Sequence, residues 1–210
     1  VIATNGDGSK LKAELIDRKV LAKPQDLIEE GKIRIVESRR ALALSNIPQD
    51  HIYFLSFPDR ELNELLLEHW EKPKTSKTTG VNQAYYEGSY KQGSLYTGRN
   101  LLDMLKEVIS STTPTIIVTH NPYDTHADHR TVYKFINLAV NELSERGVVE
   151  RPKIYSFIVH KDAFEYPRPL RFDPRAPLYP PRKLKNICNW FVYPLSDSVV
   201  KLKFQEIKIQ

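Results

Sequence analysis

The sequence THNPYDTHADHR, at residues 119–130, gathers side chains that bind metal ions and transfer protons. It contains His120, His126 and His129, which are half of the 6 histidines in the chain. A neutral imidazole is a good zinc ligand, and a second histidine beside it can act as an acid, a base or a partner for an oxyanion. This segment is therefore the first candidate for a catalytic or metal-binding site.

The spacing within the segment sharpens that prediction. His126 and His129 are three residues apart, which puts both rings on one side of a first helical turn. Asp128 suits the positive end of such a helix, and it can also orient a histidine through the ring N–H. His120 fits equally well as a ligand and as a strand-end residue bonded to the loop. An ordinary helix start with surface histidines is the alternative, and the clustering of three histidines argues against it.

The elements that must position these residues follow from hydrophobic periodicity. Four short apolar runs predict buried strands, and apolar residues at helical spacing predict three helices. The alternation predicts an α/β fold with a mainly parallel, Rossmann-like sheet flanked by helices. The predicted strands are residues 1–4, 52–55, 115–118 and 154–159, and the predicted helices are about 34–45, 95–109 and 132–143.

In open α/β sheets, ligands bind beyond the carboxyl ends of the strands. Polar or ionisable groups follow each predicted strand, at residues 5–8, 57–60, 120–129 and 160–162. These groups therefore predict a single site along one edge of the sheet.

Each of the smaller motifs also has an ordinary structural interpretation. The glycines of residues 4–8, TNGDG, fit a tight turn better than a phosphate cradle. Arg34 and Glu37 are three apart, as in an exposed helical pair. Asp59, after Pro58, is a typical turn residue. Taken alone, none of these motifs predicts a function.

Two segments interrupt the pattern. Residues 72–93 are polar and rich in Lys, Thr, Gly and Tyr, which predicts a flexible insertion or part of a binding rim. Residues 166–181 carry many of the prolines and predict an extended surface segment.

The composition limits the possible classes of protein. The 210 residues fit a single domain covering residues 1–210. The 31 basic residues exceed the 26 acidic residues by 5 and are spread along the chain, which argues against nucleic-acid binding. The single cysteine excludes an intrachain disulfide and a multi-cysteine zinc site. The chain has no run of about 18 apolar residues that would predict a transmembrane segment.

The order of the motifs resembles the LmbE-like, or PIG-L, family of zinc-dependent N-acetylglucosaminyl deacetylases. The resemblance covers most of the chain, and the usual His-Pro-Asp-His appears with alanine in place of proline. The motifs are TNGDG at 4–8, Arg34-x-x-Glu37 followed by Ala41, FLSFPD at 54–59 and DTHADH at 124–129.

The resemblance implies roles for particular residues. His129 would bind Zn²⁺, and His126 would stabilise or protonate the tetrahedral intermediate, with Asp128 orienting it. Arg34 and Asp59 would contact the sugar or its aglycone. The implied substrate is an N-acetyl amino sugar, either a small molecule or a glycolipid head group.

The resemblance also implies a His-Pro-Asp-Asp segment before residue 1, which would supply two further zinc ligands and the aspartate that activates water. The sequence contains no His-x-Asp-Asp, and the chain enters a strand at Val1 without a polar lead-in. We therefore expect the LmbE-like domain to be incomplete at its N-terminus. A catalytic zinc needs three protein ligands and one open position, so the histidine loop should not suffice alone.

Two alternative functions remain open at this point. In the first, His120, Asp124 and His129 form a complete metal site, with His126 catalytic, as in a metal phosphoesterase. In the second, the fold is a non-catalytic carbohydrate-binding domain. Its binding surface would carry tyrosines of the insertion and its flank, namely Tyr85, Tyr86, Tyr90 and Tyr96.

Overall fold

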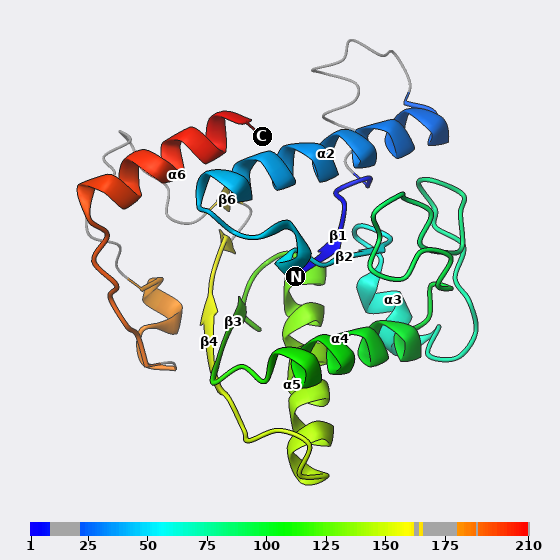
Figure 1. Cartoon of the computed structure of the whole chain (residues 1–210). Helices are drawn as coiled ribbons and strands as arrows, with labels where there is room; N and C mark the ends of the chain where they lie inside the picture. Colours follow the sequence, from blue (N-terminus) through cyan, green and yellow to red (C-terminus); the bar gives the residue numbers. More distant parts are fainter. Residues whose placement is uncertain (9–21, 162–163, 166–179, 188, 210) are drawn as a thin grey trace.

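The computed structural model describes residues 1–8, 22–161, 164–165, 180–187 and 189–209, so most of the predicted proline-rich segment lies outside the described residues (Figure 1). The predicted α/β class is confirmed. The helices are α2 (Pro24–Leu44), α3 (Leu62–Leu67), α4 (Gly98–Thr112), α5 (Ala127–Glu145) and α6 (Asp197–Ile209), with short 3₁₀ helices η1 (Gln49–His51) and η2 (Arg182–Leu184). The strands are β1 (Ile2–Thr4), β2 (Phe54–Phe57), β3 (Ile116–His120), β4 (Lys153–Phe157), β5 (His160–Lys161) and β6 (Phe164–Glu165).

Within the described residues the strands form separate pairs and not the single sheet that the sequence predicts. β1 pairs in parallel with β2, and β3 pairs in parallel with β4 over five residues. β5 and β6 form a small antiparallel pair. The parallel direction of the main strands is as expected, but a continuous Rossmann-like sheet is not present in this part of the chain.

An apolar groove of about 530 Å³ lies between the two parallel pairs. Ile2 donates its N–H to Tyr53, and Lys153 donates its N–H to Thr115. Successive residues of a strand direct their backbone N–H and C=O groups to opposite sides. The backbone groups of Ala3, which follows Ile2, therefore point away from β2. Those of the first β3 residue, which follows Thr115, likewise point away from β4. The groove is lined by all of β1 and β3 and by apolar residues of α4 and α5, among them Leu101, Leu105, Val132 and Phe135.

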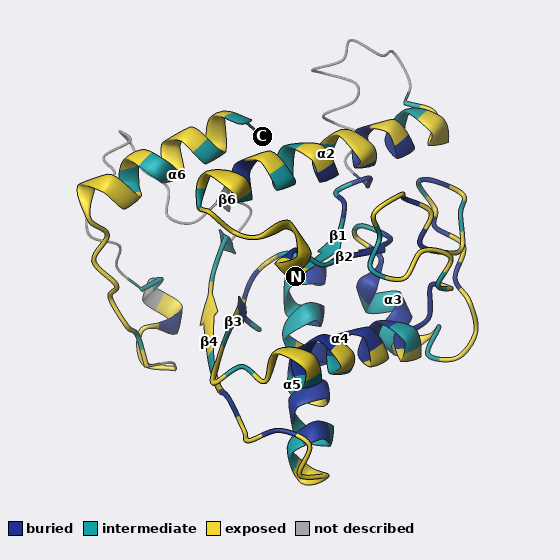
Figure 2. Cartoon of the chain, viewed as in Figure 1, coloured by how far each residue is buried: buried dark blue, intermediate teal, exposed yellow. Residues whose placement is uncertain are grey.

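The main core lies between α4 and α5, where both helical predictions are confirmed. α4 begins at Thr97, whose side chain accepts the N–H of Asn100, and ends at Thr113 in the left-handed conformation. α5 ends before Gly147, which has a φ of 67°. Each fully buried apolar side chain contributes about 1.5–3 kcal/mol to folding. The buried residues of the two helices include Leu101, Leu102, Leu105, Ile109, Phe135, Ala139, Val140 and Leu143 (Figure 2).

The structure places α6 alongside α2 (Figure 1). The side chains of Ser45 and Glu206 are hydrogen-bonded between these two elements. None of the described helices is both long and apolar enough to cross a membrane.

The insertion at residues 72–93 has no long helix or strand, yet it is packed against the domain. Lys74 is 3% exposed, and its Nζ lies 2.7 Å from Glu61 Oε2 and 2.8 Å from Glu64 Oε2. Tyr86 and Tyr96 are buried, so the prediction of a tyrosine-rich binding surface there is wrong for these two residues. The segment is a fixed part of the fold.

Replacing Lys74 should measure how firmly the insertion is held. Lys74→Ala leaves Glu61, itself 4% exposed, without its counter-ion, and should lower the free energy of unfolding by about 3–5 kcal/mol. Lys77 pairs with Glu64 at the surface, so Lys77→Ala should cost less than about 1 kcal/mol. Urea unfolding of both variants tests the comparison. Equal losses would contradict a special role for the buried pair.

Candidate active site

Four histidine rings gather where β3 ends and α5 begins. The centroids of His120 and His129 lie 3.7 Å apart in nearly parallel planes. His126 lies 4.7 Å from His129, and His160 lies 5.2 Å from it. The structure therefore joins the loop histidines to one that is 31 residues further along, since 160 − 129 = 31. The sequence signal for His160 was only its place directly after a predicted strand.

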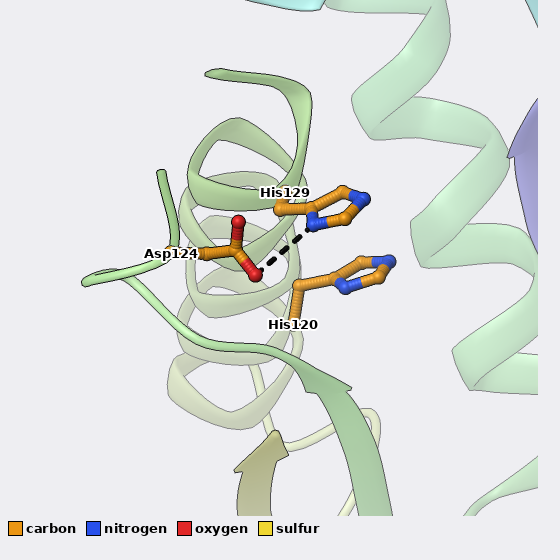
Figure 3. Close-up of side chains that lie close together, drawn as sticks. All are labelled: His120, Asp124 and His129. Carbon is orange, nitrogen blue, oxygen red and sulfur yellow. Dashed lines mark ion pairs between the residues drawn. The ribbon is translucent and has the colours of Figure 1, made fainter. Parts of the chain in front are cut away.

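Asp124 organises this cluster, although sequence reasoning included it only in the alternative ligand set. Its carboxylate is 2% exposed. Oδ1 accepts the N–H of His126 at 2.9 Å, while Oδ2 accepts the N–H groups of Val159 at 2.9 Å and His160 at 3.1 Å. Oδ2 also lies 3.1 Å from His129 Nδ1 (Figure 3). One buried carboxylate thus holds both the histidine loop and the segment after β4.

Electrostatics keep Asp124 charged and His120 neutral. Burial acts to raise the pKa of Asp124, but the three backbone N–H groups stabilise the carboxylate and bring the pKa down to about 2. Burial, followed by the charge of His129, lowers the pKa of His120 to about 4. A neutral imidazole is the form that binds a metal ion.

The donor set is chemically suited to a divalent metal ion. His120, Asp124 and His129 each offer a ligand atom, and these atoms lie within 4.8 Å of one another. Among the residues that the structure describes, the buried Nδ1 atoms of His120 and His126 find no hydrogen-bond partner. Figure 3 shows the rings of His120 and His129 side by side, with a nitrogen of each directed away from Asp124. Because Nδ1 of His129 faces the carboxylate, its Nε2 is the nitrogen available to a metal.

Asp128 contacts a different part of the chain from the one expected. Its Oδ2 accepts the N–H of Arg60 at 2.5 Å, and its Oδ1 accepts the N–H of Leu62 at 3.1 Å. Burial, followed by the charge of Asp59, raises its pKa to about 7. These hydrogen bonds hold the loop before α3. The expected orientation of His126 by Asp128 stays a prediction, and no hydrogen bond described between the two supports it.

A second cavity, of about 620 Å³, is lined by residues from separate segments of the chain. Arg34 and Asp59 line it together with His126 and His160. Arg34 Nε donates to Glu30 Oε1 at 3.0 Å, which fixes the direction of the guanidinium. His129 and Asp128 line the apolar groove instead, and His126 and Asp59 border both spaces.

Asp59 is held by the turn after β1. Its Oδ1 accepts the hydroxyl of Thr4 and its Oδ2 accepts the N–H of Gly8, both at 3.2 Å. The backbone N–H of Asp59 in turn donates to Asp7 Oδ1 at 3.3 Å. Gly6 has a φ of 69°, so the turn interpretation of TNGDG fits the structure.

Burial raises the pKa of Asp7, whose Oδ2 accepts the hydroxyl of Tyr86 at 2.5 Å. Tyr86 comes from the insertion, so this segment supports the loop that carries Asp59 through a buried side-chain contact.

The fold and the site define an α/β protein whose parallel strands end at a cluster of histidines and carboxylates. Residues 1–140, two thirds of the chain, match the family described as PIG-L: GlcNAc-PI de-N-acetylase. The chain belongs to this family. Comparison with curated proteins and with solved structures gives no match.

Asp124 should govern stability at low pH. Its pKa is lowered from 3.8 to about 2 in the folded protein, so the stabilisation is complete above about pH 4 and disappears as the pH falls towards 2. The amount is about 2 kcal/mol. Asp124→Asn should be less stable at pH 6 and should lack this part of the acid dependence. Asp103→Asn, at an exposed ion pair, is the control in denaturant unfolding at several pH values. If Asp124→Asn loses as much stability between about pH 4 and pH 2 as the wild type does, the role assigned to Asp124 is contradicted.

Proposed function

We propose that the protein is a metal-dependent hydrolase that removes the acetyl group from an N-acetylglucosamine-type substrate. Family membership supports a deacetylase-type hydrolase acting on such sugars. The observation that carries the proposal is the position of His126. His126 borders both the groove that contains His129 and the cavity that contains Arg34 and Asp59. An acetamide placed beside His126 would have its sugar in the polar cavity and its carbonyl towards the metal ligands.

His129 is the residue best placed to hold the metal, through Nε2. His120 lies beside it, and Asp124 supports it from the other ring nitrogen. Imidazole and carboxylate ligands suit Zn²⁺. A bound Zn²⁺ would polarise the acetamide carbonyl and lower the pKa of its water ligand to about 7.

In this proposal His126 acts on the tetrahedral intermediate. Burial, followed by the charge of His129, lowers the pKa of His126, so the resting ring is neutral. A neutral ring can donate its single N–H as a hydrogen bond to the developing oxyanion. To protonate the departing nitrogen it must first take up the proton that the attacking water loses, and it then returns to the neutral form. Water and the amide then give acetate and the free amino sugar.

Arg34 and Asp59 would bind the sugar or its aglycone. Both side chains have fixed positions, since Glu30 holds Arg34 and the turn after β1 holds Asp59. A preorganised pair of opposite charges can accept and donate hydrogen bonds to sugar hydroxyls without reordering.

The apolar groove between β1 and β3 supports the prediction that a further segment completes the site. A strand placed there would have β1 and β3 as parallel neighbours, and their carboxyl ends lie at Thr4 and His120. The carboxyl end of the added strand would reach the same edge. We propose that the remaining metal ligands and the carboxylate that activates water come from a segment in this groove.

The loop alone is a less favourable metal site. The proximity of His120, Asp124 and His129 favours the alternative of a metal phosphoesterase. However, the Asp124 oxygens already accept three backbone N–H groups, and the two rings are within 7° of parallel. Parallel rings direct their lone pairs side by side and not at one ion. The loop is therefore better suited to supply part of a site.

His129→Ala should abolish specific zinc binding, because it removes the ligand that Asp124 orients. Zinc content by elemental analysis after dialysis is the measurement. A second cluster of potential ligands, formed by Glu64, Glu68 and His69, could also hold zinc. His69→Ala disrupts this second cluster and is therefore the control, which should retain the zinc bound at His129. Full occupancy in His129→Ala together with normal acetate release would remove the assignment.

His126→Ala should separate chemistry from metal binding. Made in a protein that includes the segment proposed for the groove, the variant should keep its zinc and lose about two decades or more of turnover in acetate release from N-acetylglucosaminides. Wild-type turnover would show that His126 is only a neighbour of the reacting atoms. Loss of zinc instead would favour the ligand set of the loop-only alternative.

A further inference from the structure

Arg60 has a backbone conformation that a long side chain rarely adopts. Its φ is 65°, in the left-handed region. There the Cβ atom comes too close to the following carbonyl oxygen, which makes this region unfavourable for residues other than glycine. Glycine could form a tight turn at this point without strain, so the turn itself does not explain why the residue is an arginine.

The neighbouring loop residues are tied to separate parts of the fold, which is what holds Arg60 in this conformation. Asp128 accepts the N–H of Arg60 itself and that of Leu62. Asp59 is fixed by the turn after β1, and Glu61 pairs with the buried Lys74. Strained residues persist where the surroundings impose them, and they are frequent at binding and catalytic sites.

Arg60 lines the same 620 Å³ cavity as Arg34 and His126. Arg34 already donates to Glu30, and the Asp59 carboxylate already accepts from Thr4 and Gly8. Within the described ranges, no carboxylate forms an ion pair with the Arg60 guanidinium. The exposed Arg60 thus brings to the cavity a guanidinium without an ion-pair partner among the described residues, in a space that Glu37 and Asp59 also line.

We propose that Arg60 binds an anionic group carried by the substrate, a phosphate or a carboxylate on the amino sugar or its aglycone. A guanidinium presents paired N–H donors that match these planar or tetrahedral anions, and the fixed backbone limits the directions that the side chain can take. This inference rests on the proposed function in one respect, that the cavity holds an N-acetyl amino sugar. Arg60 is then the residue that selects charged substrates over neutral ones.

The conformation of Arg60 allows a variant that removes the side chain without harming the fold. Glycine adopts a φ of 65° freely, so Arg60→Gly should melt at the same temperature as the wild type or higher. Thr113→Gly is the matched control, because Thr113 is also left-handed, with a φ of 39°, and ends α4 away from this cavity. Arg60→Lys retains the charge and removes the paired donors.

Calorimetric binding of four probes tests the inference without requiring turnover. They are neutral N-acetylglucosamine, its 1-phosphate, its 6-phosphate and N-acetylmuramic acid, whose charge is a carboxylate. The wild type should bind at least one anionic probe more tightly than the neutral sugar. Arg60→Gly should weaken that binding by about ten- to a hundredfold and leave the neutral sugar unaffected. Arg60→Lys should fall between the two, and Thr113→Gly should match the wild type.

The outcomes separate this inference from the proposed function. Equal binding of neutral and anionic probes, or wild-type affinity in Arg60→Gly, overturns the role of Arg60 even if acetate is released. No binding of any anionic probe overturns it as well. Binding that depends on Arg60, but with no acetate release from any probe by a protein that includes the segment proposed for the groove, supports the role of Arg60 and counts against the deacetylase assignment.

Discussion

The site depends on one buried carboxylate. Asp124 accepts backbone N–H groups from its own loop and from Val159 and His160, which lie 35 and 36 residues further along the chain. An unpaired charge would be costly at this depth, and the three N–H groups offset that cost. Because these bonds fix the loop against the segment after β4, they also fix the spacing of the histidine rings. Without Asp124, the loop would keep the hydrogen bonds of Thr125 to His160 and of Asn121 to Ser156, but it would lose the carboxylate that lies against His129.

A second set of buried polar contacts places the loop between β2 and α3 against the histidines. Asp128 holds the residues before α3, and Tyr86 supports Asp59 through Asp7. Asp128 comes from the helix that carries His129, so the same first turn positions His129 and the loop before α3. The insertion that carries Tyr86 thereby supports the loop of Asp59, which lines the 620 Å³ cavity. Networks of this kind are effective only when every member has its partner.

Sequence reasoning succeeded where the signal is local. The apolar spacing of α4 and α5 and the clustering of His126 and His129 are visible in a short window, and the structure places them as expected. The partners of Asp124 and Asp128 are backbone groups far along the chain, and backbone groups leave no mark in the sequence. The left-handed Arg60 could not be predicted either, because its conformation is imposed by neighbours from three segments. The order of strands in a sheet is likewise non-local, and the described strands form pairs with a groove between them.

The central claim is that the histidine loop at the end of β3 binds the catalytic metal. Anomalous scattering at the zinc absorption edge, from crystals of the protein grown with zinc, locates the ion directly. The account predicts a peak about 2.0–2.1 Å from His129 Nε2, bordering the apolar groove and facing His126. A peak confined to Glu64, Glu68 and His69, or no peak within coordination distance of His129, would contradict it.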